Sequence, residues 1–211
     1  AIMSRELVTR FPQIYDYTTV WMEDITHVTR QGTKVFGLTN TNKLLRSYEG
    51  CKGLKTGSTS IAKYCLSATA VRNGIELISV IMTAPNSKTR FANAAALLNY
   101  GFGKCVLYTD ENKDVLPEIR VKRGVEKTVP CRYEGEFNYL DTDGADLSAI
   151  KKEIVMQEEM EAPLLNGDSA GEAQYFLNDK KIGAVKLLVD KDVEKAGFFD
   201  YLKEAWYAYL C

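Results

Sequence analysis

Five consecutive residues, Lys55-Thr56-Gly57-Ser58-Thr59, combine a cation, three hydroxyls and a glycine in a segment that reads as extended. A lysine and a hydroxyl on one strand attract a carboxylate through charge-assisted hydrogen bonds. A backbone N–H near Ser58 can point into an oxyanion hole, and Gly57 lets a substrate backbone approach closely. This run therefore predicts a site for a ligand that carries a carboxylate.

Other residues that could do chemistry form no second pattern. His27 is the single histidine, so a Ser-His-Asp triad would have to use it, and we interpret it instead as a surface or capping residue. No two cysteines have the close Cys-x-x-Cys spacing of a zinc or redox site, so we expect no metal and no cofactor. We expect mainly free thiols, packed as small apolar side chains, among Cys51, Cys65, Cys105, Cys131 and Cys211.

The elements that must hold the Lys-Thr-Gly run follow it directly. Residues 64–71 and 75–82 are apolar and predict two buried strands, and Asn73-Gly74 between them predicts a tight hairpin. Ser87–Tyr100 has helical spacing, with Ser87 as the expected N-cap and glycines at 101 and 103 as the expected end. Upstream, we expect a helix capped by Ser4, extended structure over 15–21, and a hairpin turn at 31–33.

The second half of the chain has a different character. Residues 1–103 hold 12 Lys/Arg and 6 Asp/Glu, whereas the rest holds 15 and 22. The basic half would suit an anionic ligand, but we interpret the asymmetry mainly as solvated surface. Short β-like runs separated by turn residues predict a small all-β unit. We therefore expect three parts, 1–103, 104–195 and 196–211. The expected strands lie within 105–108, 118–122, 127–131, 154–160, 172–177 and 184–189.

The last part predicts an amphipathic helix over 198–210. Phe199, Leu202, Trp206 and Tyr209 recur at helical spacing, which gives one aromatic face. Tryptophan and tyrosine favour the headgroup level of a bilayer, but the nearly neutral polar face gives little attraction to anionic lipid. Two interpretations stay open from the residues alone, contact with a membrane surface and packing on the chain's own domain.

With its context, the Lys-Thr-Gly run resembles the third motif of the penicillin-binding serine acyltransferases. Nearly the whole chain is similar to their low-molecular-mass D-alanyl-D-alanine carboxypeptidases. The resemblance implies an α+β fold, with part of a transpeptidase-like domain of antiparallel sheet and helices, a small all-β domain and a C-terminal amphipathic helix. The matching segments are 40–45, 53–57, 62–64, Arg90, 97–102, 162–164, Gly167-Asp168 and Gly171.

The resemblance also implies roles for individual residues. Lys55, Thr56 and Gly57 would belong to the catalytic motif, with Lys55 in its proton and electrostatic network. Thr56 and Ser58 would bind the terminal substrate carboxylate, and the Ser58 N–H would be an oxyanion donor. Arg90 would lie near that carboxylate, although a first-turn surface arginine is the alternative.

The activity implied is removal of the terminal D-alanine from a peptidoglycan stem peptide ending in D-Ala-D-Ala, through an acyl-serine. β-Lactams would inhibit, and neither a cofactor nor nucleic acid is expected. The C-terminal helix would anchor the protein at the outer face of the bacterial cytoplasmic membrane, and the cell wall is the alternative location. The alternatives are a non-catalytic cell-surface scaffold module and a β-lactamase-like enzyme.

Two family motifs are missing from the expected places. Ser-x-x-Lys and then Ser-x-Asn should precede Lys-Thr-Gly, yet both Ser-x-x-Lys strings follow it, at Ser60–Lys63 and Ser148–Lys151, and no Ser-x-Asn occurs. We interpret both strings as chance matches. We expect a fragment that begins inside the transpeptidase domain, is inactive alone, and lacks the segment or chain that carries the nucleophile. Lys52 also departs from the acidic residue that relatives often have there.

Overall fold

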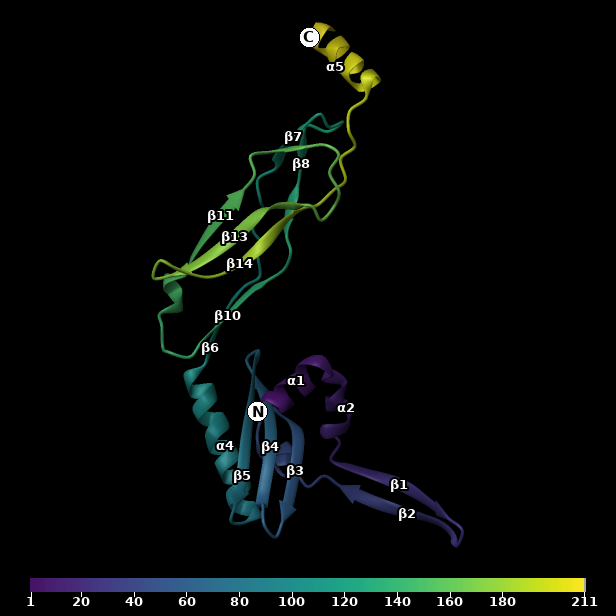
Figure 1. Cartoon of the computed structure of the whole chain (residues 1–211), viewed down its shortest axis with the longest axis vertical. Coiled ribbons are helices and arrows are strands. Elements are labelled where there is room, and N and C mark those ends of the chain that lie inside the picture. The colour runs from purple at the N-terminus through teal and green to yellow at the C-terminus, as the bar shows by residue number, and fades with distance from the viewer. Residues whose placement is uncertain (211) are drawn as a thin grey trace. The chain divides into compact units, whose positions relative to one another are not determined.

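The computed structural model describes residues 1–210, without the side chains of 207, 208 and 210, and divides the chain into two compact units. The first comprises Ala1–Leu107 with Thr142–Gly144, and the second comprises Tyr108–Asp141 with Ala145–Cys211. Figure 1 shows a helix-backed sheet in the first unit and several small sheets in the second. The mixed α+β class with antiparallel sheets and a C-terminal helix agrees with the class expected above.

A three-stranded antiparallel sheet organises the first unit. Its strands are β3 (Cys51–Thr59), β4 (Lys63–Arg72) and β5 (Ile75–Ala84), in the order β3-β4-β5. The hairpin prediction is confirmed, because Asn73 and Gly74 both have positive φ, 49° and 77°, as a tight two-residue turn requires. The Lys-Thr-Gly run therefore lies on the edge strand β3.

Helix α4 (Ser87–Lys104) packs on this sheet. Leu66, Ile81 and Ala84 of the sheet form one buried cluster with Ala94 and Leu98 of the helix. Two expected boundaries are wrong. The Asn86 side chain, not Ser87, caps the helix by accepting from the Thr89 N–H, and the helix continues through Gly101. Gly101 faces Leu77, where an added Cβ would lie 2.6 Å from a methyl carbon, so the glycine serves close packing and does not end the helix.

The N-terminal segment forms α1 (Ile2–Arg10), a 3₁₀ turn (Pro12–Ile14) and the short α2 (Tyr15–Thr18). Ser4 lies inside α1 and not at its cap, and its hydroxyl is 2.8 Å from that of Ser67 on β4. The extended structure expected over 15–21 is wrong at α2. Hydrogen bonds from Thr18 to the Lys52 carbonyl and from Tyr15 to Glu76 fix α2 on the sheet, and this tertiary context overrides strand propensity.

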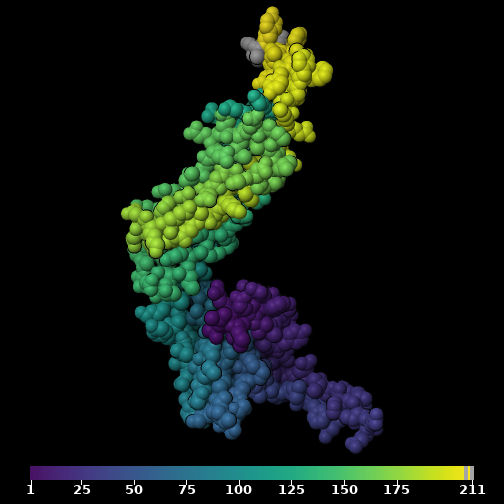
Figure 2. All heavy atoms as spheres, viewed as in Figure 1, coloured from purple at the N-terminus to yellow at the C-terminus, as the bar shows by residue number. Residues whose placement is uncertain are grey.

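An antiparallel hairpin, β1 (Met22–Thr29) and β2 (Gly32–Thr39), extends from the first unit (Figures 1 and 2). All of its residues are exposed, and its turn is one residue earlier than expected, at Arg30-Gln31. A polar loop then leads into α3 (Leu44–Ser47) and so into β3. This loop becomes important at the site.

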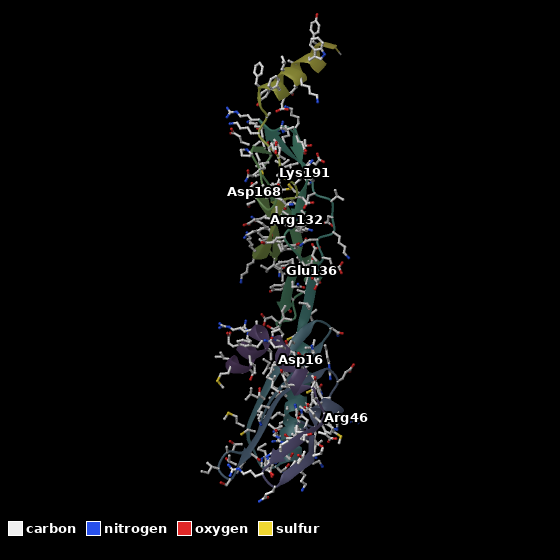
Figure 3. All side chains as sticks on the ribbon, turned by 90° about the vertical axis from the view of Figure 1, so that its right-hand side faces the viewer. Asp16, Arg46, Arg132, Glu136, Asp168 and Lys191 are labelled. Atoms are coloured by element: carbon white, nitrogen blue, oxygen red, sulfur yellow. The ribbon has the colours of Figure 1, made fainter. Side chains whose placement is uncertain are left out.

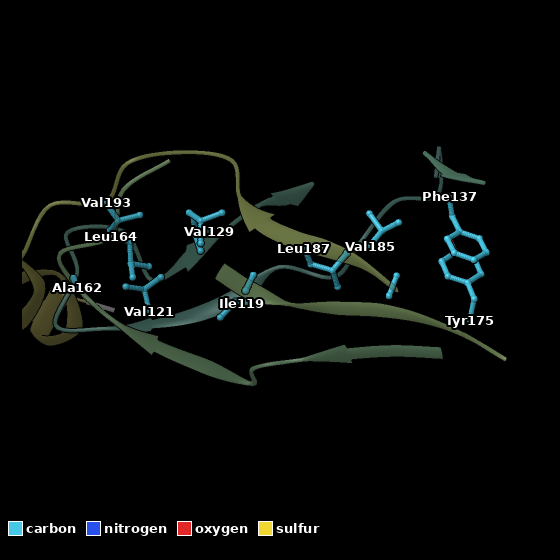
Figure 4. Packing of buried hydrophobic residues seen from close by; sticks show 13 residues of the cluster. Ile119, Val121, Val129, Phe137, Ala162, Leu164, Tyr175, Val185, Leu187 and Val193 are labelled. Atoms are coloured by element: carbon cyan, nitrogen blue, oxygen red, sulfur yellow. The ribbon is translucent and has the colours of Figure 1, made fainter. Parts of the chain in front are cut away.

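The second unit is rich in β-structure, as expected. One sheet has the order β11-β13-β14-β9, another β12-β7-β8, and β6 pairs with β10. Their shared core includes Ile119, Val129 and Leu187, and it ends in a stacked pair, Phe137 and Tyr175, with ring centroids 3.8 Å apart (Figure 4). The strands are β6 (Val106–Asp110), β7 (Ile119–Lys122), β8 (Thr128–Val129), β9 (Cys131–Tyr133), β10 (Phe137–Asp141), β11 (Lys151–Met156), β12 (Glu159–Glu161), β13 (Ser169–Leu177) and β14 (Lys180–Val189), with a 3₁₀ turn at Leu147–Ala149.

Charged side chains cover the surface of the second unit, among them Arg132 and Lys191 (Figure 3). Arg132 pairs with Asp190 at 2.9 Å and Lys191 with Glu126 at 2.5 Å, and all four partners are substantially exposed. Exposed pairs of this kind contribute little to stability. Helix α5 (Phe198–Leu210) forms as predicted, and within residues 1–210 no helix has the length and apolarity needed to cross a bilayer.

Candidate active site

The predicted site residues converge on β3. Lys55, Gly57 and Ser58 are exposed, whereas the Thr56 side chain is buried. Arg90 reaches the same strand from the first turn of α4, because its guanidinium bonds to the Gly57 carbonyl. The structure thus brings together all five residues that sequence reasoning selected.

An open groove of about 760 Å³ runs over the sheet beside Lys55. Residues from all three strands line it, and the first residues of α1 close one side. Most of the lining is apolar, and Lys55 is the one lysine or arginine among the described residues that line it. The Lys55 ammonium donates to the Thr56 carbonyl at 2.5 Å, so it lies against the strand. The groove therefore places a positive charge at the border of an apolar surface.

Thr56 has a partner that the sequence did not reveal. Its hydroxyl oxygen lies 2.6 Å from that of Thr41 in the loop between β2 and α3. The flanking asparagines fix this loop. Asn40 donates to the Thr18 and Val20 carbonyls, while the buried Asn42 donates to the Gly53 carbonyl at 3.1 Å. The sequence signal was the Asn-Thr-Asn run before an apolar pair, but only the fold shows that Thr41 meets Thr56.

Arg90 is buried, with 5% of its surface exposed, so it is not the surface arginine of the alternative interpretation. Its Nη1 donates to the carbonyls of Gly57 and Cys65, which face each other across β3 and β4, at 3.4 and 3.2 Å. Its Nη2 donates to the Ser87 hydroxyl, and Phe91 lies under the guanidinium. Nε has no partner among the described residues, and no described carboxylate neutralises the charge. A buried cation with spare donors favours an anion nearby.

The structure shows a contact that accounts for a lysine at position 52, where relatives often have an acidic residue. Its ammonium lies 5.1 Å from the centre of the Tyr15 ring, a cation–π contact. Burial raises the pKa of Tyr15 to about 12, and the hydrogen bond from its hydroxyl to Glu76 adds to the shift. The phenol therefore stays protonated at neutral pH. Tyr15 ties α2 to β5 and does not serve as a base.

Neither Ser-x-x-Lys string is arranged as a nucleophile with its base. Ser148 donates to Asp146 at 2.7 Å, and Lys151 lies 3.9 Å from Asp179. Ser60 and Lys63 are exposed at the turn between β3 and β4 and line one shallow pocket, with no hydrogen bond between them. Within the described residues, neither serine hydroxyl is therefore hydrogen-bonded to the lysine of its own string.

The remaining candidates stay outside the site. His27 is exposed on β1 with its ring against Phe36. Four cysteines are free thiols, and the described residues contain no cluster of metal-ligating side chains. Cys211 lies outside the described residues. These positions offer no rival catalytic centre within residues 1–210.

Comparisons with known proteins match both units. Residues 1–86 match the family model described as D-alanyl-D-alanine carboxypeptidase, and residues 108–195 match that of the C-terminal domain of penicillin-binding protein 5. The carboxypeptidase DacF of Bacillus subtilis is 30% identical over 96% of this chain and 51% of its own length. DacC of Escherichia coli is 32% identical over 76% of this chain and 40% of its own. The chain thus spans about half the length of the curated relatives it matches, or less.

Solved structures agree with this result. Penicillin-binding protein 5 from Haemophilus influenzae superposes with a TM-score of 0.64 at 28% identity, covering 92% of this chain and 55% of that one. Penicillin-binding protein 3 from Streptococcus pneumoniae, at 23% identity and a TM-score of 0.63, shares the fold over the same fractions. Since two models of one architecture match in order and a relative aligns along nearly the whole sequence, the chain belongs to the D-alanyl-D-alanine carboxypeptidase family of penicillin-binding proteins.

Proposed function

We propose that this chain supplies the carboxylate-binding wall of a serine D-alanyl-D-alanine carboxypeptidase that matures peptidoglycan. The observation that carries the proposal is the set of donors around β3. The Thr56 hydroxyl belongs to the Lys-Thr-Gly strand, the buried Arg90 guanidinium bonds to the Gly57 carbonyl of that strand, and no described carboxylate pairs with either group. The C-terminal carboxylate of a D-Ala-D-Ala stem peptide is an anion of suitable chemistry.

Each residue then has a part in the reaction. Thr56 and Ser58 bind the terminal carboxylate, and Arg90 supports it from beneath the strand. The Ser58 N–H donates to the oxyanion that forms when a serine attacks the scissile carbonyl, and the Lys55 ammonium contributes to the electrostatics of proton transfer. Water then hydrolyses the acyl-serine. β-Lactams inhibit because they present a similar carboxylate and a reactive carbonyl to the same wall.

We also infer that the acylated serine is not among these 211 residues. The order of the motifs supports this inference, as does the absence, within the described residues, of a hydrogen bond between Ser60 and Lys63 or between Ser148 and Lys151. The chain alone would then bind ligands at β3 without turning them over. A β-lactamase is disfavoured, because the second unit matches the C-terminal domain of penicillin-binding protein 5.

The test is a titration of the isotope-labelled chain with N-acetyl-D-Ala-D-Ala, followed by NMR. We expect saturable shifts at the backbone amides of Gly57 and Ser58, and weaker binding after Thr56→Val. Thr33→Val, on the exposed hairpin, is the matched control and should bind as the wild type does. Absence of shifts on β3, or equal shifts in wild type and Thr56→Val, would overturn the proposal.

A membrane-surface location accompanies this function. We propose that α5 binds lipid at the outer face of the cytoplasmic membrane, and its aromatic side chains support this. Phe198, Phe199, Trp206 and Tyr209 are all exposed on a helix that is too short to cross a bilayer. Aromatic residues at an exposed amphipathic face are typical of interfacial helices.

A further inference from the structure

We infer that Thr41 is a positioning residue, which orients the Thr56 hydroxyl toward the substrate carboxylate. The inference rests on the proposed function. It starts from the hydroxyl pair at 2.6 Å, in which either oxygen can be the donor. Thr56 is 8% exposed, and Thr41 is the one hydrogen-bond partner of its side chain within the described residues. The state of the Thr56 proton therefore depends on Thr41.

Counting protons shows why this matters. A threonine hydroxyl has one proton and two lone pairs, whereas an ionised carboxylate only accepts. If Thr56 donates to Thr41, it has no proton left for the ligand. If Thr41 donates to Thr56, the Thr56 proton is free and the carboxylate can accept it. Ligand binding thus requires the arrangement in which Thr41 is the donor.

This arrangement also strengthens when the ligand is bound. A hydroxyl that donates to a charge is polarised, so its oxygen becomes a better acceptor for the next hydroxyl in the chain. The bond from Thr41 to Thr56 is consequently worth more with the carboxylate present than without it. Removing the Thr41 hydroxyl should therefore weaken carboxylate binding, in addition to any loss of stability in the ligand-free protein.

The loop is built to hold Thr41 in place. Asn42, which is 2% exposed, donates to the Gly53 carbonyl at the start of the Lys-Thr-Gly strand and accepts from the Leu44 N–H. Asn40 accepts from the Asn42 N–H at 2.9 Å and donates to carbonyls before β1. Both neighbours of Thr41 are thus fixed by side-chain bonds, although Thr41 itself is exposed. These bonds fasten the loop to β3 close to the point where the two hydroxyls meet.

The experiment compares Thr41→Val with Thr41→Ser in the same NMR titration. Valine keeps the branched shape without a donor, and serine keeps the donor. We expect Thr41→Val to bind N-acetyl-D-Ala-D-Ala about fivefold more weakly, or ~1 kcal/mol, and Thr41→Ser to bind as the wild type does. The C-terminal amide of the dipeptide, which has no carboxylate, should show no change in affinity between wild type and Thr41→Val.

The outcomes separate this inference from the function on which it rests. If the wild type shows no response to the acid, the proposed function fails and this inference fails with it. If the wild type and Thr41→Val bind the acid equally, only the role of Thr41 is overturned. A loss that Thr41→Ser does not restore, or an equal loss for acid and amide, would show a merely structural role and would also overturn it.

Discussion

Arg90 is the residue that most constrains the site. Burying a guanidinium is costly unless its donors are satisfied, and here two strand carbonyls and one hydroxyl satisfy part of them. Hydrogen bonds that involve a charged group contribute about 1.5–3 kcal/mol each, which offsets much of the desolvation. The charge itself remains without a described counter-ion, so the residue both ties β3 to β4 and leaves a positive potential beneath the Lys-Thr-Gly strand.

The two serines that precede x-x-Lys allow a direct prediction. We expect no stable covalent labelling of the chain by a fluorescent penicillin, because Ser148 donates to Asp146 and Ser60 has no bond to Lys63. Denaturing electrophoresis with fluorescence detection measures the label. Ser60→Ala and Ser148→Ala serve as matched controls and should leave the background unchanged. Label that disappears in either variant would show that its serine is acylated.

Sequence reasoning at this scale found residue types but not their partners. Lys55 through Ser58 were recognisable because the motif is contiguous. Thr41 was not, since its contact with Thr56 crosses 15 positions and depends on a loop that side-chain amides fix. Ser4 failed as a cap for a similar reason, because its hydroxyl faces Ser67 on a strand far along the chain.

The edge strand β3 depends on two glycines in different ways. Gly50, just before the strand, has φ +77°, and a Cβ there would lie 2.1 Å from the Val71 carbonyl oxygen. At Gly57 no atom lies within 4 Å of an added Cβ. The fold therefore requires glycine at 50 but not at 57. We infer that the glycine of the Lys-Thr-Gly motif instead allows a ligand backbone to approach the strand closely.

We accordingly expect opposite effects from two alanine substitutions. Gly57→Ala should leave the unfolding free energy unchanged or raise it by up to ~1 kcal/mol, and should weaken acid-dipeptide binding at least about tenfold, because its methyl group meets the ligand backbone. Gly50→Ala should lose roughly 1–3 kcal/mol of stability. Urea unfolding and the NMR titration measure the two quantities. Unchanged binding in Gly57→Ala would contradict the close approach of substrate to this strand.

Element prediction succeeded where the signal was local. The β4–β5 turn follows from Asn73-Gly74, and α5 follows from its aromatic spacing. It failed where packing decided the outcome, at α2 and at Gly101 in α4. Strand β10 was missed because it is short and its inward Phe137 gains its meaning only by stacking on Tyr175.

At the scale of the whole molecule, the division of the chain into three parts stays a prediction from the sequence. The change in charge and periodicity predicts a boundary between residues 103 and 104. In the structure, contacts divide the two units between Leu107 and Tyr108. Residues Thr142–Gly144 belong to the first unit although they follow much of the second unit in the sequence. The sequence does not predict this, because a three-residue loop has neither a helical nor a strand pattern of apolar residues. Boundaries drawn from sequence patterns therefore do not reveal that Thr142–Gly144 belongs to the first unit.

Helix α5 permits a test of membrane binding by the whole chain. We expect the chain to pellet with liposomes and a Phe199→Ser, Trp206→Ser double variant to stay in the supernatant, since both side chains are largely exposed and lose their apolar surface. Asp200, Lys203 and Glu204 are the charged residues of this helix, so neutral and anionic liposomes should bind similarly.

The control for the liposome test is Val115→Ser, because Val115 is 97% exposed and lies outside α5. This variant should pellet as the wild type does. The ion pair between Lys127 and Glu204, at 2.7 Å, joins the helix to the segment between β7 and β8, but both partners are exposed, and such a pair contributes ~1 kcal/mol or less. Phe199 and Trp206 are both largely exposed in spite of this pair. Equal pelleting of the double variant and the wild type would show that α5 is not the membrane contact.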